Sequence, residues 1–543
     1  MRRRGILSAV VGVALLAGCA GIPTSGDVQT VRIDSDPVEV PSIALPESPQ
    51  PGQSPEEILE GFIRAGRGPQ TNYSVAREFL APGTEWSGTA RVLVSSSPIE
   101  PVRVDESTYS ITLNVTAEVD ATGRYSPTSQ QQTLLYEFTE VDGEYRISSA
   151  APGTVLSAAN FATVFDPYPL YFFDPSFTFL VPDLRWFPIT RATADRIVDE
   201  LLIGPSTEPG VLFSAFPAGT VGSAASTAPQ VAVELSPEVR AESGRTQRRM
   251  LQQLQRSLAV LGNVSEVVVT ADGLDLSPAV EGNPPEWRYA VGDLFGGAEG
   301  RVVEFALDGG LTSLPGIGAR ADDLGATAAT LSRDERSLAV LGDDGVTLVG
   351  PSGAPIAIDE RPGLAAPAID PFGFVWTVPV RNPGGLRATD ASGEVHDIRL
   401  AANGRIVSIE LSRDGARLLV ALATDDGPRL FVAGVQRDAD LAPVALSAPQ
   451  SFSVDGPIRD VAWVDGMTIA VLRDPPSGTV VDLLPLGGPR ESLGLVEGGE
   501  QIVGGTGREG IRVLTGDGVV LRPSAAGGWV DTGLTASFLG TRQ

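Results

Sequence analysis

Few residues in this chain could carry out nucleophilic, acid–base or metal chemistry. Its 543 residues include one cysteine, Cys19, and one histidine, His396, and all 40 basic residues are arginine. These totals exclude a Schiff-base lysine, a phosphate-binding lysine and a Cys/His zinc cluster. Arginine stays protonated, so carboxylates are the only realistic acid–base catalysts. We interpret His396, in the strand-like stretch SGEVHDIRL, as a structural or solvated strand residue.

The single Cys19 could be a buried apolar residue, a catalytic thiol, a metal ligand or an attachment point. Three arginines at positions 2–4 precede an apolar run at 5–17. That run, of about 13 residues, is too short for a membrane span of ~20 residues but fits a signal peptide. Small residues then stand directly before the cysteine. The alternative is an ordinary secretory signal with a chance cysteine, or a buried cysteine.

The arrangement resembles the lipobox of bacterial lipoproteins. This resemblance implies that residues 1–18 are a signal peptide, and that Cys19 carries S-diacylglycerol and N-acyl chains. Two or three acyl chains anchor a protein stably, since each buried CH₂ contributes about 0.8 kcal/mol. Signal peptidase II would cut before Cys19 after recognising three residues: Leu16, Ala17 and Gly18.

The charge balance limits the partners. The formal net charge is −27. Binding to nucleic acid needs a basic footprint, and attachment to anionic lipid through surface charge needs a basic patch. We therefore expect no nucleic-acid partner, and a membrane contact made by the lipid anchor alone.

A tether and a small α+β domain are predicted after the anchor. Residues 19–53 are Pro-rich without periodicity and read as a linker, which at about 3.1 Å per residue could reach ~100 Å. A helix should begin at SPEEILEGFIRAG, because Ser54, Pro55 and Glu57 form a capping-box pattern. A short helix in SVAREFLAP and alternating runs then predict a curved antiparallel sheet, with a hairpin turn at VDGEY. The domain, 54–155, is similar to NTF2-like or cystatin-like folds.

Residues 165–280 predict a second α+β domain. YPLYFFDPSFTFLVPDLRWFP reads as two aromatic-rich strands, and TRATADRIVDELLIGPST as a helix. In RTQRRMLQQLQRSLAVLG, leucines recur at helical spacing at Leu251, Leu254, Leu258 and Leu261. With the strands QVAVELS and VSEVVVTADG, this succession is similar to the GerMN family, named from spore germination proteins. That family is not known for catalysis.

An internal repeat marks the C-terminal half. LSRDERSLAVLGDDGVTLVG begins at Leu331 and LSRDGARLLVALATDDGPRLFVAG at Leu411. Related stretches are IDPFGFVWTVP, VAWVDGMTIAVLRD and QIVGGTGREGIRVLTGDG. Their spacing of about 38–51 residues is that of one four-stranded propeller blade. Residues 285–543 therefore predict a β-propeller of five to seven blades, with six expected, and the motif resembles TolB-type propellers. A β-sandwich array is the alternative.

The propeller offers few candidates for chemistry. The acidic pairs at 343–344 and 425–426 lie in turns, where we expect solvated side chains. No stretch has the alternating oxygen donors and glycine of a calcium loop. Trp376, Trp463 and Trp529 could stack on a sugar, but we expect them in the core or at blade rims. We predict no cofactor and no metal.

The whole succession of modules is similar to the LpqB family of actinobacterial lipoproteins, as are GCAGIPTSG and EEILEGFIRAG. This resemblance implies a non-enzymatic protein at the extracytoplasmic face of the cell membrane. It also implies a partner, the extracytoplasmic part of a sensor histidine kinase, MtrB, in a two-component system linked to cell-wall homeostasis and division. Two alternatives stay open: an envelope scaffold that binds cell-wall glycan or peptide, and a carboxylate-dependent hydrolase.

Overall fold

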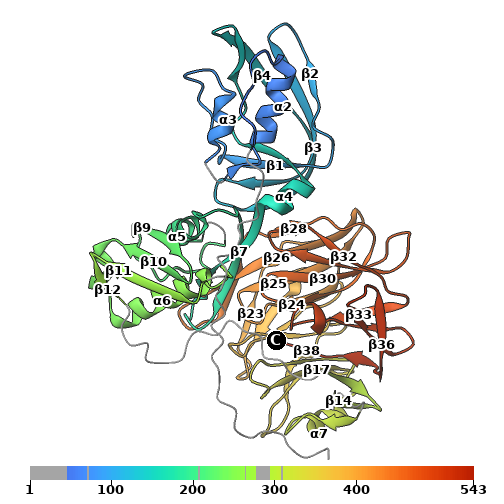
Figure 1. Cartoon of the computed structure of the whole chain (residues 1–543). Helices are drawn as coiled ribbons and strands as arrows, with labels where there is room; N and C mark the ends of the chain where they lie inside the picture. The colour runs from blue at the N-terminus through green and yellow to red at the C-terminus, as the bar shows by residue number, and fades with distance from the viewer. Residues whose placement is uncertain (1–45, 70–71, 206–207, 263, 277–293, 307–309) are drawn as a thin grey trace, which may run out of the picture. The chain divides into compact units, whose positions relative to one another are not determined.

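The computed structural model describes residues 46–543 except 70–71, 206–207, 263, 277–293 and 307–309 (Figure 1). The predicted signal peptide and most of the predicted tether lie outside these ranges, as do the predicted site residues Leu16, Ala17, Gly18 and Cys19. Among the described helices, none is both long and apolar enough to cross a membrane.

Helix α2 opens the N-terminal domain. It spans Pro55–Ala65 and begins as predicted: the Ser54 hydroxyl accepts from the Glu57 amide, and the Glu57 carboxylate accepts from the Ser54 amide. Its apolar face buries Ile58, Leu59 and Phe62. A short helix, α3, follows at Ser74–Glu78. Both helices contribute to one core with the inward side chains of the sheet.

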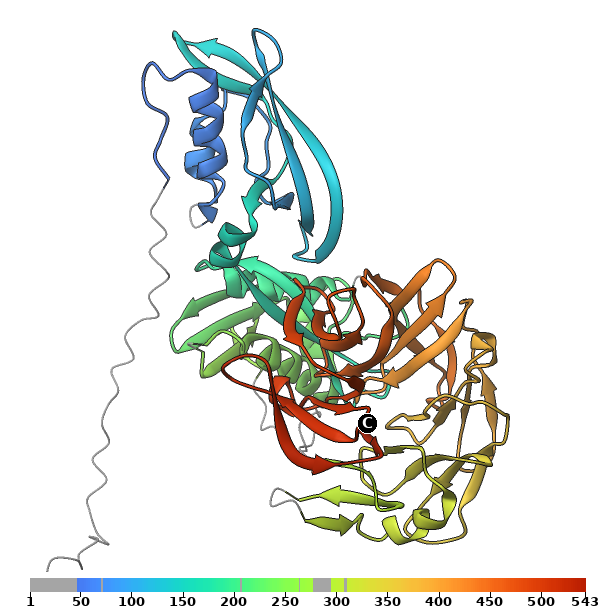
Figure 2. The same cartoon turned by 90° about the vertical axis from the view of Figure 1, so that its right-hand side faces the viewer.

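The long, curved blue-to-teal strands beside the blue helices in Figure 2 belong to the N-terminal sheet. Its strand order is β5-β4-β3-β1-β6, with β2 paired to β3. Its strands are β1 Arg91–Ser95, β2 Pro101–Arg103, β3 Thr108–Asp120, β4 Tyr125–Val141, β5 Glu144–Ser149 and β6 Thr154–Ser157. The β4–β5 turn is the predicted Asp-Gly hairpin, with positive φ at Asp142 and Gly143. The predicted strands β1, β3, β4 and β5 pair antiparallel, as expected. The sequence did not predict β6, which runs parallel to β1 because the chain crosses over before it returns.

The middle domain combines a long hairpin with a small sheet. After α4 (Ala158–Val164), strands β7 (Phe165–Phe173) and β8 (Leu180–Pro188) pair over their whole length, as the aromatic runs predict. The sheet order is β12-β11-β10-β9, with β9 Gly222–Thr227, β10 Gln230–Leu235, β11 Glu266–Ala271 and β12 Leu274–Asp275. Helices α5 (Thr193–Ile203) and α6 (Gly244–Leu258) share its core, and η2 spans Pro237–Ala241. The predicted Leu261 lies beyond the end of α6, where it is half-buried against the same core.

The C-terminal half is a β-propeller. The described residues form six successive sheets of four or five strands, the number of blades expected. The first blade contains β13 Phe295–Ala298, β14 Arg301–Phe305 and β15 Leu311–Ser313. The second contains β16 Ala328–Leu331, β17 Leu338–Gly342, β18 Gly345–Val349 and β19 Ile356–Asp359. The third contains β20 Ala368–Ile369, β21 Val375–Thr377, β22 Arg387–Thr389 and β23 Val395–Asp397.

The fourth blade contains β24 Arg405–Leu411, β25 Arg417–Thr424, β26 Gly427–Arg437, β27 Pro443–Leu446 and β28 Gln450–Phe452. The fifth contains β29 Ile458–Trp463, β30 Thr468–Arg473, β31 Val480–Pro485 and β32 Glu491–Leu495. The sixth contains β33 Gly499–Val503, β34 Arg512–Thr515, β35 Val519–Pro523 and β36 Trp529–Thr535. Short helices α7 Gly318–Ala321, η3 Asp322–Leu324, η4 Pro383–Gly385 and η5 Arg508–Gly510 lie in the connections.

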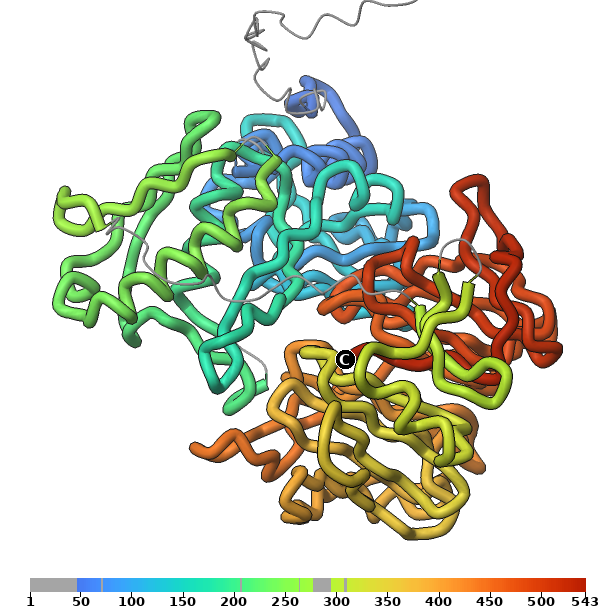
Figure 3. The backbone as a smooth tube through the Cα atoms, turned by 90° about the horizontal axis from the view of Figure 1, so that it is seen from below, coloured from blue at the N-terminus to red at the C-terminus, as the bar shows by residue number. Residues whose placement is uncertain are grey.

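The end of the chain closes the ring. Strand β37 (Phe538–Leu539) pairs with β13 of the first blade, and β38 (Thr541–Arg542) pairs with β16 of the second. The yellow-green first blade consequently lies beside the red last one (Figure 3). The terminal residue, Gln543, is buried: its amide donates to the Leu331 carbonyl, and its side-chain oxygen accepts from the Ile369 amide at 2.8 Å.

The two copies of the SRD motif build the same turn. In the second blade, the Ser332 hydroxyl donates to the Asp334 carboxylate at 2.7 Å. In the fourth, Ser412 and Asp414 repeat that bond at 2.6 Å. In each copy the serine oxygen also accepts a hydrogen bond from the backbone N–H of the residue five positions later in the sequence. The repeat thus encodes the tight connection between the first two strands of a blade.

Candidate functional site

The candidates within the propeller have structural surroundings. His396 lies on β23, with its ring edge-to-face against Phe374 at 5.5 Å. Trp376 is fully buried, and its indole N–H donates to the Asp370 carboxylate at 3.1 Å. Trp463 is buried, and Trp529 lies partly buried against the core of the last two blades. We find no tryptophan of the three on an open face suited to stacking on a sugar.

The acidic residues that the structure describes show no grouping suited to a metal. The pairs at 343–344 and 425–426 are exposed in hairpin turns, as predicted. Across the described ranges, no three His, Cys, Asp or Glu side chains come together in a way that could hold a metal ion.

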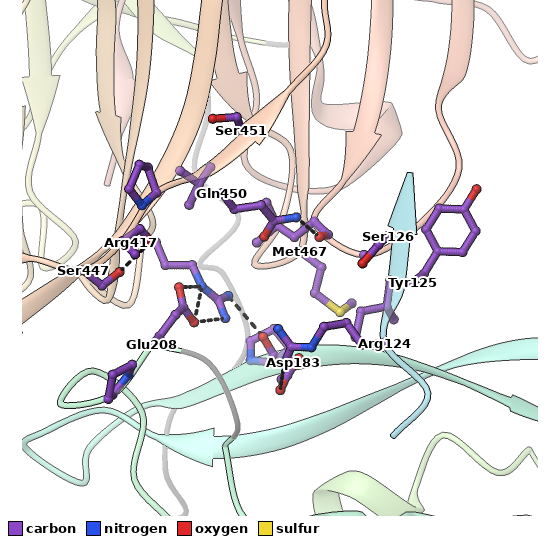
Figure 4. Close-up of a pocket in the computed structure, with 18 of the residues that line it drawn as sticks. Arg124, Tyr125, Ser126, Asp183, Glu208, Arg417, Ser447, Gln450, Ser451 and Met467 are labelled. Atoms are coloured by element: carbon purple, nitrogen blue, oxygen red, sulfur yellow. Dashed lines mark hydrogen bonds and ion pairs between the residues drawn. The ribbon is translucent and has the colours of Figure 1, made fainter. Parts of the chain in front are cut away.

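A cavity of about 690 Å³ lies where three parts of the chain meet (Figure 4). We call it the junction cavity. Its walls come from the start of β4 in the N-terminal domain, from β8 and the loop after α5 in the middle domain, and from the fourth and fifth blades. The residues that line it and carry charge are Arg124, Asp183, Glu208 and Arg417.

Arg417 is the central side chain of this cavity. Its guanidinium is only 5% exposed and lies 3.0 Å from the carboxylate of Glu208, in the loop after α5. It also donates to the carbonyls of Pro182 on β8 and Gly466 in the fifth blade. Burial opposes the charge, but the ion pair with Glu208 outweighs it and raises the pKa of Arg417. This one side chain therefore connects its own blade, the fourth, to the middle domain and to the fifth blade.

A second ion-paired group forms the opposite wall. Asp183 on β8 accepts from Arg185 at 2.7 Å, and Arg124 lies 3.8 Å from the same carboxylate. Arg185 is almost completely buried and also donates to the Thr122 carbonyl in the β3–β4 turn. The pair thus connects β8 with the N-terminal domain.

Two aromatic residues of the β7–β8 hairpin extend this contact. The indole N–H of Trp186 donates to the Gly487 carbonyl of the fifth blade at 2.6 Å. At the hairpin tip, the ring of Phe179 lies edge-to-face with Phe372 at 6.2 Å, and the Arg333 guanidinium lies 4.9 Å from its centre. The hairpin is therefore fixed to the propeller along its length.

The chemistry of the junction cavity suits binding rather than bond cleavage. Asp183 and Glu208 each accept from a buried arginine, so both are engaged in holding segments together. Its other polar groups are amides and hydroxyls such as Gln436, which donates to the Pro209 carbonyl at 2.9 Å. A nucleophile next to a general base, the arrangement that covalent catalysis needs, is not found among its described lining residues.

A second feature is the outer face of the N-terminal sheet. On β3 and β4 the inward residues are buried, and the outward ones alternate with them. The register of β3 with its neighbours β2 and β4 places Val102 and Leu135 on either side of Ser110. The same register places Thr112 opposite Thr133. Val102 and Leu135 are 60% and 56% exposed. On the same face, Glu118 of β3 and Glu137 of β4 stand at the two ends of a stretch without charge. We call the residues of that stretch the uncharged face: Val102, Ser110, Thr112, Asn114, Gln131, Thr133 and Leu135.

Sequence reasoning did not predict either feature. Arg417 stands in the repeat motif, where the earlier copy has Ser337, and this replacement was the available signal. A large charged residue at a position occupied by a small one elsewhere in the repeat indicates a contact made outside the blade. The uncharged face could have been found from the alternating Ser, Thr and Asn residues in STYSITLNVTAEV.

Comparison with known families agrees with the domains described. Residues 48–162 match the N-terminal domain of lipoprotein LpqB, 169–277 match the sporulation and spore germination domain, and 300–536 match the β-propeller domain of lipoprotein LpqB. A solved GerMN domain, the first of the sporulation protein GerM from Bacillus subtilis, is similar at 18% identity and a TM-score of 0.19, over 22% of this chain and 93% of that one. A score this low adds nothing to the assignment.

Relatives that match most of this chain are also named lipoprotein LpqB. Lipoprotein LpqB of Nocardia farcinica is 27% identical over 552 residues, covering 88% of this chain and 87% of the relative. Lipoprotein LpqB of Streptomyces coelicolor is 28% identical over 503 residues, covering 80% of each. The matches span all three domains in the same order. The chain is therefore similar to the LpqB lipoproteins over most of its length, and it matches both of their named domains.

Proposed function

We propose that this protein is an exported lipoprotein, anchored through Cys19 to the extracytoplasmic face of the cell membrane. There it binds the extracytoplasmic part of an MtrB-like sensor histidine kinase and modulates two-component signalling linked to cell-wall homeostasis and division. It acts by binding and not as an enzyme. The family resemblance suggests the partner, and the relatives' designation as lipoproteins supports the anchor.

The uncharged face is the observation that supports a protein partner. One residue in five of this chain is charged, and the net charge is −27, yet the seven residues of this face carry no charge. The centres of protein–protein interfaces are depleted in charged residues, and this face also exposes two large apolar side chains. It belongs to the first domain after the tether, the part of the body closest in sequence to the anchor.

Introduced charge tests the proposal. The double variant Val102→Glu/Leu135→Glu places two carboxylates within the uncharged face, without changing a buried residue. We expect binding to the kinase's purified extracytoplasmic domain to weaken by about tenfold or more, because burying an unpaired charge at an interface costs several kcal/mol. Surface plasmon resonance with the full chain gives the affinity.

The matched control is Val395→Glu/Ile356→Glu, which adds the same charge at two exposed apolar positions of the propeller. The control should bind like the unmodified chain. Equal weakening in both variants would indicate general charge repulsion and contradict the assigned surface. Absence of binding by the unmodified chain, together with unchanged kinase output when its gene is deleted, would contradict the proposed function itself.

A further inference from the structure

A second cavity, of about 630 Å³, lies between the last blade and the first. Four arginines line it: Arg413, Arg512, Arg522 and Arg542. Apolar side chains, among them Phe305 and Leu534, form another part of its wall. Four cations around one cavity are unexpected in a chain with a net charge of −27, and they differ in whether a carboxylate neutralises them.

Arg542 is already neutralised. One of its nitrogens lies 2.6 Å from the Glu304 carboxylate, and another contacts Glu335. Arg413 is buried, and its guanidinium lies so close to Gly505 that a side chain at that position would collide with it. Both residues thus have fixed positions in the wall of the cavity.

Arg512, which is half-buried, and Arg522, which is exposed, occupy opposed positions of two neighbouring strands. Strands β34 and β35 pair Val513 with Leu521, which places Arg512 directly opposite Arg522. Like charges at opposed positions destabilise a sheet. Arg512 donates only to the backbone carbonyls of Glu509 and Ile511, neither of which cancels its charge.

No ion pair with a described carboxylate compensates these two arginines. Two acids, Glu509 and Asp531, also line the cavity, but neither forms an ion pair with Arg512 or Arg522. Burial, followed by the nearby charge of Arg522, lowers the pKa of Arg512. The arrangement leaves two positive charges side by side, next to an apolar wall.

We propose that this cavity binds a small phosphate monoester, with the phosphate between Arg512 and Arg522 and its organic part against Phe305 and Leu534. A phosphate monoester carries close to two negative charges at neutral pH, which matches the two uncompensated guanidinium groups. Arginine binds phosphate oxygens through pairs of parallel hydrogen bonds. The cavity is within the usual size range of small-molecule sites. This assignment is independent of the kinase partner.

Calorimetric titration of the full chain in detergent with phenyl phosphate tests the site. We expect saturable binding at millimolar concentration or below, weaker binding of inorganic phosphate and of benzoate, and none of benzylamine. The variant Arg512→Gln/Arg522→Gln should weaken phenyl phosphate binding by about tenfold or more, because it removes the charge-assisted hydrogen bonds to the phosphate oxygens.

The control is Arg387→Gln/Arg459→Gln, which removes two arginines from exposed ion pairs elsewhere in the propeller and changes the net charge equally. It should bind phenyl phosphate as the unmodified chain does. Without ligand, the single variant Arg522→Gln should melt at the same or a higher temperature, since it relieves repulsion, and phosphate should no longer raise that temperature. Equal binding by both double variants, tighter binding of benzoate, or no saturable binding would overturn the proposal.

Discussion

The guanidinium of Arg417 on β25 lies 3.0 Å from the carboxylate of Glu208, which stands 209 residues earlier in the loop after α5. Arg417 is 5% exposed and Glu208 is 18% exposed. An ion pair this deep connects the middle domain to the propeller with a geometry that a surface pair would not maintain. Four predictions about the protein follow, the first from this pair.

Removing Glu208 should leave a buried and unpaired cation. We expect Glu208→Leu to lower the free energy of unfolding by about 3 kcal/mol, the amount typical of breaking a buried ion pair from one side. Differential scanning calorimetry should show the middle domain and the propeller melting in more clearly separated transitions. The control is Glu60→Leu, whose ion pair with Arg64 is exposed on helix α2 and should contribute less than about 1 kcal/mol. Equal effects of the two variants would refute the role given to the Arg417–Glu208 pair.

The buried carboxyl of Glu410 should make the propeller sensitive to pH. Burial raises its pKa from 4.5 to about 8, although the Trp463 amide donates to it. As the pH rises from 4.5 towards 8, the unfolded chain loses this proton before the folded one does. The contribution of Glu410 to the stability of the folded state is therefore complete below pH 4.5 and is lost as the pH rises through about 8. The free energy of unfolding falls over this range by at most about 1.4 kcal/mol per pH unit.

The variant Glu410→Gln should flatten this dependence, because glutamine keeps an oxygen that can accept from the Trp463 amide and cannot ionise. Unfolding by urea across this pH range measures the slope. Part of the slope should remain at lower pH, since burial also raises the pKa of Asp460 to about 6. The exposed Glu360 provides the control, and Glu360→Gln should retain the slope of the unmodified chain. An unchanged slope in Glu410→Gln would show that other groups produce it.

The C-terminal strands should be essential to the closure of the propeller. Deleting residues 537–543 removes β37 and β38, and with them the pairing to the first and second blades. It also leaves the Ile369 amide without the Gln543 oxygen that it donates to. We expect a lower melting temperature and faster proteolysis within the first blade. The milder Gln543→Ala should cost about 1–3 kcal/mol, and a deletion that melts like the intact chain would contradict ring closure by these strands.

Cys19 should be the point of membrane attachment. In cells, Cys19→Ala should keep its signal peptide and take up no fatty acid, because the thiol is the group that is acylated. Ser25→Ala, just beyond the cleavage site, should be processed and labelled normally. Labelling with radioactive palmitate, followed by electrophoresis, distinguishes the two. Normal labelling of Cys19→Ala would refute the assignment.

Local chemistry made much of the fold predictable. The capping box at Ser54, the Asp-Gly turn at 142–143 and the aromatic strands of the long hairpin follow from interactions between neighbours in sequence, and the structure confirms all three. The spacing of the SRD repeat indicated the propeller because each copy encodes its own turn. The parallel strand β6 could not be predicted in this way, since its partner β1 is far away in the sequence.

The sequence by itself determined the classes of chemistry that this protein lacks, the kind of anchor expected at Cys19 and the order of its modules. Those conclusions depend on which residues are present and on short-range patterns. Only the tertiary structure decided that Arg417 meets Glu208, that Arg512 opposes Arg522 without an ion-paired carboxylate, and that seven uncharged residues gather on one part of a sheet face. Each of these depends on pairing between distant segments, because strand register and domain contacts place side chains that no local pattern brings together.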